Sequence, residues 1–106
     1  MSIKNTKSDA VEAESSVAFI EDTRIEQISK NGLHFSRSLL HANNVSIEKA
    51  ENNAVSLGKL SRAFIRNSKL SENEVGINVK SHSNLSIESS VLSKNKADVV
   101  SDKNDQ

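Results

Sequence analysis

A spacing of 22 residues recurs through nearly the whole of this 106-residue chain. Gly32, Ala54, Gly76 and Asp98 follow one another at this interval, and a similar apolar pattern follows each of them. Repeats of this length are typical of stacked supersecondary units, because one unit alone cannot bury its apolar face. The sequence therefore predicts a solenoid in which consecutive repeats share one continuous core.

Within each repeat the apolar residues lie two positions apart, which is the spacing of a β-strand and not of a helix. The pairs of the first column are Val11 and Ala13, Leu33 and Phe35, Val55 and Leu57, and Ile77 and Val79. The second column holds Ala18 and Ile20, Leu40 and Ala42, Ala63 and Ile65, and Leu85 and Ile87, and the third holds Ile3, Ile25, Ile47, Leu70 and Leu92. We therefore expect three short strands in each repeat, with side chains alternating between core and solvent.

The repeat tolerates small changes of length in its turns. The octets AFIEDTRI at 18–25 and AFIRNSKL at 63–70 match in chemical type but begin one residue further apart than two periods. The period is restored at Gly76, so we expect one extra residue in the turn before the second octet and one fewer after Leu70. A turn column of short polar residues is also predicted to bond between repeats or to free backbone groups: Asp22, Asn44, Asn67 and Ser89.

This repeat resembles that of the right-handed parallel β-helix, the solenoid of pectate lyases, alginate epimerases and phage tailspikes. The stretch AFIRNSKLSENEVGINV at 63–79 carries the resemblance: an inward strand, Asn67 at a turn, Leu70, Asn73, and then Gly76 opening the next strand. The resemblance implies an all-β, right-handed parallel β-helix of about four rungs of 22 residues, each rung being one repeat with three short strands. It does not define an activity, because enzymes and non-enzymes share this fold.

The period also predicts the boundaries of the rungs. We expect residues 1–9 to form a partial N-terminal rung or cap, four full rungs at 10–31, 32–53, 54–75 and 76–97, and a partial rung with a polar tail at 98–106. Open strand edges invite association. The chain is therefore predicted to be part of a longer solenoid, or to have its ends covered by polar tails, by an edge partner or by self-stacking.

Two other repeat folds do not fit the sequence. A leucine-rich repeat needs a leucine three positions before the paired apolar residues and an asparagine after them. The earlier positions are Lys30, Asn52, Glu74 and Lys96, and the later ones are Ser38, Leu60 and His82. A helical repeat fits less well still, because the apolar residues recur at a spacing of two and not of three or four.

Charge and composition exclude several classes of function. The 14 basic and 14 acidic residues give a formal net charge of zero, so neither nucleic acid nor an anionic membrane is expected as a partner. The absence of cysteine excludes disulfides and thiolate metal sites without identifying the compartment. No signal-peptide-like apolar stretch is present, and the longest apolar run is 17–20, so we expect a soluble chain of undetermined localisation.

The candidate binding residues occupy two outward columns on one predicted face. The first column contains Phe19, His41, Phe64 and Ser86, and the second contains Glu21, Asn43, Arg66 and Glu88. Sugar rings and peptide edges stack on aromatic residues, so we predict a binding strip, with polysaccharide as the possible partner, at Phe19, His41, Phe64, Arg66 and Glu88. The alternative is that flanking polypeptide or a turn covers the strip.

No catalytic residue, metal site or cofactor is predicted. His34, His41 and His82 lie in different columns without acidic partners at metal-ligand spacing, and no glycine-rich phosphate loop or nucleophile-elbow motif occurs. Arg66 between Asn43 and Glu88 comes nearest to the acid and base arrangement of polysaccharide lyases, but a solvated surface ion pair between neighbouring rungs is the favoured explanation. We therefore favour a non-catalytic scaffold or binding module, and keep as the alternative a fragment of a carbohydrate-active enzyme: a polyuronate lyase, epimerase or hydrolase.

Overall fold

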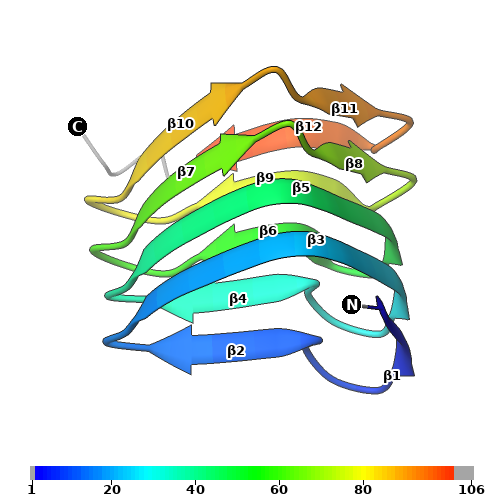
Figure 1. Cartoon of the computed structure of the whole chain (residues 1–106), viewed down its shortest axis with the longest axis horizontal. Coiled ribbons are helices and arrows are strands. Elements are labelled where there is room, and N and C mark those ends of the chain that lie inside the picture. The colour runs from blue at the N-terminus through cyan, green and yellow to red at the C-terminus, as the bar shows by residue number, and fades with distance from the viewer. Residues whose placement is uncertain (1, 102–106) are drawn as a thin grey trace.

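The computed structural model describes residues 2–101, and all pairings between its strands are parallel (Figure 1). The strands are β1 (Ser2–Thr6), β2 (Val11–Glu14), β3 (Val17–Ile28), β4 (Leu33–Ser36), β5 (Leu39–Ala50), β6 (Asn53–Leu57), β7 (Arg62–Arg66), β8 (Lys69–Ser71), β9 (Val75–Val79), β10 (Asn84–Glu88), β11 (Val91–Ser93) and β12 (Ala97–Ser101). Within these described residues there is no helix that is long and apolar enough to cross a membrane.

The strands stack into two sheets whose order follows the repeat. One sheet runs β1-β3-β5-β7-β10, with β8 paired to β5 and β11 paired to β8, and the other runs β12-β9-β6-β4-β2. In the second sheet Val11 lies opposite Leu33, Leu33 opposite Val55, and Val55 opposite Ile77, so each rung lies directly above the previous one. The prediction of an all-β parallel solenoid is confirmed, with about 5 turns spaced about 22 residues apart.

The corners of each rung are formed by residues in the left-handed backbone region. One corner column contains the predicted turn residues Asp22, Asn44, Asn67 and Ser89, and two further columns contain Ser15, Arg37, Leu60 and His82, and Asn5, Gln27, Lys49, Glu72 and Lys94, all with φ between 50° and 61°. At the first corner β3 and β5 bend without interruption, so two of the expected short strands are joined into one of 12 residues. In the next two rungs the same path is divided into β7 and β8, and into β10 and β11.

The predicted insertion and deletion lie in the expected turns. Leu39 pairs with Arg62, a separation of one residue more than the period, whereas Phe35 still pairs with Leu57. The extra residue therefore lies in the turn between β6 and β7. The normal separation has returned where Asn53 pairs with Val75, after β8.

Leu60 combines a left-handed backbone with an exposed apolar side chain, at φ 60° and 61% exposure. We expect Leu60→Gly to raise the free energy of unfolding by about 0.5–1 kcal/mol, because glycine removes the Cβ clash of this conformation at a smaller entropic cost. Leu60→Ala retains the Cβ and should differ from the wild type by less than about 0.5 kcal/mol. Urea denaturation of the three proteins measures both values, and an equal gain in both variants would contradict the backbone explanation.

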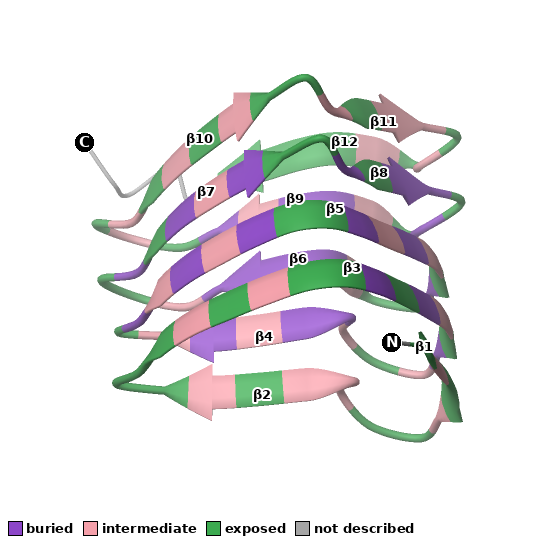
Figure 2. Ribbon diagram, in the orientation of Figure 1, coloured by how far each residue is buried: buried purple, intermediate pink, exposed green. Residues whose placement is uncertain are grey.

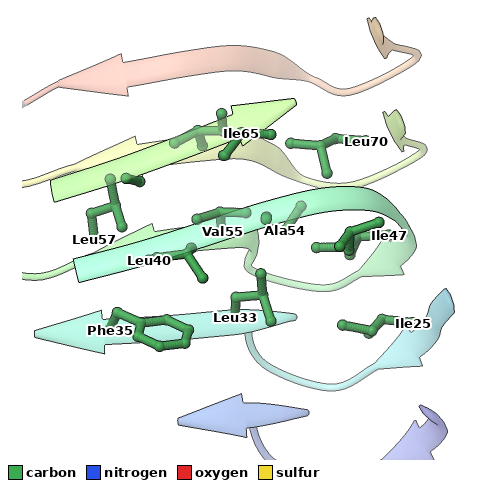
Figure 3. Packing of buried hydrophobic residues seen from close by; sticks show 14 of the residues in the cluster. Ile25, Leu33, Phe35, Leu40, Ile47, Ala54, Val55, Leu57, Ile65 and Leu70 are labelled. Atoms are coloured by element: carbon green, nitrogen blue, oxygen red, sulfur yellow. The ribbon is translucent and has the colours of Figure 1, made fainter. Parts of the chain in front are cut away.

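The core fills the space between the two sheets (Figure 2). Burial alternates along most strands as the sequence predicted, but in β6 the residue between the inward pair, Ser56, is also buried. The fully buried side chains belong to the central rungs, including Ile25, Phe35, Leu40, Ile47 and Leu70 (Figure 3). The outermost strands, β1 and β2 at one end and β10 to β12 at the other, contribute only partly buried apolar residues. Aliphatic residues of the central rungs therefore pack against counterparts one rung above and below, and only the middle of the stack buries its side chains fully.

Glycine opens two of the rungs because the backbone of the next rung approaches closely there. A Cβ on Gly32 would lie 2.6 Å from the carbonyl oxygen of Ala54 and 2.8 Å from Cγ2 of Ile47. A Cβ on Gly76 would lie 2.5 Å from the carbonyl oxygen of Asp98. At Gly32 and Gly76 the next rung is thus too close for any side chain, whereas Ala54 and Asp98 occupy the same column in the other rungs.

A ladder of serines joins the rungs at one turn. The backbone NH of Ser16 donates to Ser38 Oγ at 3.0 Å, that of Ser38 to Ser61 Oγ at 3.3 Å, and that of Ser61 to Ser83 Oγ at 3.0 Å. The hydroxyl of Ser38 in turn donates to the carbonyl oxygen of Ser36 at 2.7 Å. These bonds pair turn NH groups that would otherwise be unsatisfied where the strands end.

Asparagines form the corresponding ladders at another turn. The backbone NH and the Nδ2 of Asn31 both donate to Asp9 Oδ1 at 3.0 Å. Asn53 repeats the arrangement one rung further on, donating to Asn31 Oδ1 at 3.1 and 2.9 Å. Each side chain therefore connects two rungs, which holds the turns of successive rungs in register.

Candidate functional site

The predicted aromatic column forms a continuous stack of rings on the outside of β3, β5 and β7. The centroids of Phe19 and His41 are 4.7 Å apart with an interplanar angle of 4°, and those of His41 and Phe64 are 5.1 Å apart with an angle of 14°. The strands hold this geometry because the three residues are partners in the parallel register. Both faces of the His41 ring therefore lie against phenylalanine, while Phe19 is 70% exposed.

The outer surface of residues 17–21, 39–43, 62–66 and 84–88 is called the aromatic face below. On one side of the ring stack the column of Glu21, Asn43, Arg66 and Glu88 follows the same register. Arg66 Nε lies 3.3 Å from Glu88 Oε1, and the two side chains are 65% and 64% exposed. An ion pair this open to solvent contributes less than about 1 kcal/mol to stability.

All five residues predicted for the binding strip are thus on the aromatic face. Phe19, His41 and Phe64 are in mutual contact, and Arg66 and Glu88 pair beside them. Whether they bind a ligand remains a prediction. The chemistry that they offer is ring stacking together with exposed charged and amide groups, which suits recognition of a ligand at a surface.

Two hollows lie along the ring stack. The smaller, of about 150 Å³, lies between the rings and the polar column and is lined by Phe19, Glu21, His41, Ala42, Asn43, Phe64 and Arg66. The larger, of about 320 Å³, is lined by Arg62, Ala63, Phe64, Asn84, Leu85 and Ser86. The second hollow occurs where the aromatic column changes from Phe64 to Ser86 in the next rung.

A much larger groove, of about 930 Å³, was not found by sequence reasoning. It follows the corner column that contains Gln27, Lys49 and Glu72, and its other wall includes Glu74 and Lys96. Charges of both signs line it, and Lys96 Nζ is 3.4 Å from Glu74 Oε1. The groove was missed because its corner residues are ordinary side chains in a left-handed conformation, for which the sequence has no glycine signal.

Among the residues that the structure describes, the ionisable groups do not gather into a metal site. Among residues 2–101 no group of three or more His, Cys, Asp or Glu is placed to hold a metal ion. The three histidines lie on different strands or turns, His34 on β4, His41 on β5 and His82 in the turn before β10. Nδ1 of His34 is the one buried side-chain nitrogen or oxygen of the described residues that has no hydrogen-bond partner.

The parallel stack, its corner turns and its polar ladders define a β-solenoid protein with one aromatic outer face. The family model described as "Right handed beta helix region" matches residues 1–105. The chain therefore belongs to the right-handed β-helix family, as the resemblance of residues 63–79 implied. No curated protein and no solved structure shows significant similarity to it.

Proposed function

We propose that this chain is a non-catalytic β-helix module, a rigid scaffold that presents its aromatic face as a binding surface for a ring-bearing ligand such as a polysaccharide. The observation that supports this proposal is the ring stack of Phe19, His41 and Phe64, which is held at the rung spacing on an outer sheet face. Exposed rings in such an array have no role in core packing. A polymer whose rings repeat along its length could contact several of them at once.

The proposed scaffold role is supported by the way polar side chains are used. Serine and asparagine side chains bond between rungs at the turns, and all the strands pair with neighbours in register. Few side chains on the aromatic face take part in these bonds, apart from Asn43, which accepts from Asn67 Nδ2 at 3.0 Å. The face is therefore positioned by the ladders while its rings stay accessible.

Replacing Phe19 and Phe64 together with serine tests the binding surface. We expect capture by immobilised polysaccharides, measured on a panel that includes polygalacturonate and alginate, to fall about tenfold, because each phenylalanine supplies aromatic contact, through its edge or its outer face, worth roughly 0.5–1.5 kcal/mol. Val91→Ser, which removes an exposed apolar side chain from β11, is the matched control and should bind like the wild type. Unchanged capture by the double variant at preserved thermal stability would remove this proposal.

The same panel distinguishes the enzyme alternative. A carbohydrate-active enzyme would draw on the aligned column of Asn43, Arg66 and Glu88, in which the basic and acidic groups are already adjacent. A lyase acting through Arg66 would produce an unsaturated uronate, which is followed by its ultraviolet absorbance during incubation with the polymer. Product formation that is lost in Arg66→Gln would replace the binding proposal by the lyase one.

A further inference from the structure

The ring stack stops inside the solenoid although the sheet that carries it continues. Phe64 on β7 is the register partner of Ser86 on β10, just as His41 is the partner of Phe64 one rung earlier. One face of the Phe64 ring lies against His41, 5.1 Å between centroids. The opposite side of Phe64 meets a residue without a ring, so the stack has a position at the level of Ser86 that no aromatic side chain occupies.

This position coincides with the hollow of about 320 Å³. Phe64 lines one side, Ser86 and Leu85 line the next rung, and Asn84 and Arg62 line the edge. Parallel aromatic rings in proteins stack with centroids roughly 4.5–7 Å apart, which is the separation that adjacent rungs impose here. A flat ring that enters the hollow would therefore continue the stack at its natural spacing.

The charge at the hollow differs from that on the other side of the rings. Arg66 is paired with Glu88, but the side chain of Arg62 has no ion pair or hydrogen bond with any other residue in the described range 2–101. Its register neighbours are Leu39 and Asn84, neither of which is charged. A guanidinium group that has no ion pair favours a carboxylate as its ligand, because it can bind the carboxylate through two parallel N–H···O bonds.

We propose that Phe64, Ser86 and Arg62 form a shelf that binds a planar aromatic acid. The aromatic ring stacks on the free face of Phe64 above Ser86, and its carboxylate pairs with the Arg62 guanidinium at the edge of the hollow. The Asn84 amide and the Ser86 hydroxyl supply further hydrogen-bond donors beside the ring. The shelf rests on the proposed use of the aromatic face for binding and specifies one chemical class of ligand for one place on it.

The probe for this shelf is 2-naphthoate, titrated into the isotope-labelled full chain and followed by amide chemical shifts. We expect a dissociation constant on the order of 1 mM, as suits a small ligand on an open shelf, with the largest shifts around Phe64 and Ser86. The neutral analogue 2-naphthylmethanol should bind about threefold more weakly because its contact with Arg62 lacks charge, and Arg62→Gln should remove that difference. Galacturonate, which has the carboxylate but no planar ring, should bind more weakly than 2-naphthoate.

Ser86→Phe is the decisive variant, because it fills the position with a ring of the chain itself. We expect it to raise the melting temperature through the added stacking and to abolish 2-naphthoate binding. Phe64→Leu keeps apolar bulk but removes the aromatic face, so it should also abolish 2-naphthoate binding. This variant tests the shelf if Ser86→Phe does not fold. Persistent binding in a folded variant of either kind, or shifts located elsewhere, would overturn the shelf.

Phe19→Ser separates the shelf from the wider binding surface. This variant leaves Phe64, Ser86 and Arg62 in place, so 2-naphthoate should bind it as it binds the wild type. Loss of polysaccharide capture in Phe19→Ser with retained 2-naphthoate binding would support both proposals. Polysaccharide capture without any 2-naphthoate binding would overturn the shelf alone, and 2-naphthoate binding without capture of any polymer would retain the shelf and remove the wider surface.

Discussion

Replacing Phe35 with alanine is expected to lower the free energy of unfolding by about 3–5 kcal/mol. Phe35 on β4 is 0% exposed and is the only aromatic side chain in the buried cluster of residues 2–101, where its register partner in the next rung is Leu57 (Figure 3). Removing the ring loses its burial and leaves a cavity, since the hydrogen-bonded rungs cannot collapse onto the space. A loss of this size is a large fraction of the total free energy of unfolding of a small domain.

Phe19→Ala is the matched control for this prediction, because the same side chain is removed from the outer face of β3. Phe19 is 70% exposed, so its loss should cost about 1 kcal/mol or less, from the contact with His41 alone. Guanidinium denaturation followed by circular dichroism gives both values. Comparable losses in the two variants would mean that the ring of Phe35 is not buried as described.

Replacing Asn73 with alanine is expected to cost about 2–4 kcal/mol. The side chain is 3% exposed, and its Oδ1 accepts a hydrogen bond from the NH of Ala50 at 2.9 Å. Its Nδ2 donates to the carbonyl oxygen of Ile47 at 3.3 Å and to Asn95 Oδ1 at 3.0 Å. Alanine would leave the buried NH of Ala50 without this partner and would remove the bond to the carbonyl oxygen of Ile47, whereas Asn95 Oδ1 keeps a bond from the backbone NH of Asn73. A buried group left without a partner carries a desolvation penalty of about 1–3 kcal/mol.

Asn53→Ala is the control, because Asn53 is also an asparagine of a turn ladder but is only half-buried. Its side chain donates to Asn31 Oδ1, which keeps a second bond from the backbone NH of Asn53 after the substitution. We expect a loss of about 1 kcal/mol, measured in the same denaturation experiment. Equal losses of unfolding free energy in Asn73→Ala and Asn53→Ala would show that burial does not determine how much these side-chain hydrogen bonds stabilise the protein. Hydrogen exchange of the Ala50 amide should report the opening at Asn73 directly.

Much of the architecture could be predicted because each rung repeats one pattern. Apolar residues two positions apart identify strands, and the period of 22 residues places Leu33 above Val11 and Val55 above Leu33. The single-residue insertion near Lys59 and Leu60 was visible because both the octets and the resumed period surround it. Such features are local or strictly periodic, so the strands and register of one rung predict those of the neighbouring rungs.

The left-handed residues at the corners of the rungs could be predicted only in part. Asp22, Asn44 and Asn67 were recognisable as turn residues because short polar side chains tolerate the left-handed conformation. Gln27, Lys49 and other corner residues adopt the same conformation without any sequence signal, because strand pairing on both sides of the corner imposes it. The groove that follows this second corner was therefore not anticipated.

The binding face was predicted only in part, for a similar reason. The register placed Phe19, His41, Phe64, Arg66 and Glu88 on one face, and the structure agrees with that placement. The orientation of the rings, which lie against one another, and the position above Phe64 where the stack ends depend on side-chain packing between rungs. The burial of the Ser38 and Asn73 ladders also became visible only with the rungs stacked.

By itself, the sequence determined that this protein is a parallel stack of rungs, which residues face inward, and which columns share a face, because strand alternation and a constant period translate directly into register. Only the tertiary structure decided how closely the rungs approach at Gly32, which polar side chains are buried, and where rings leave a position open. Those properties depend on distances between residues one full turn apart. A linear pattern orders such residues but does not measure the space between them.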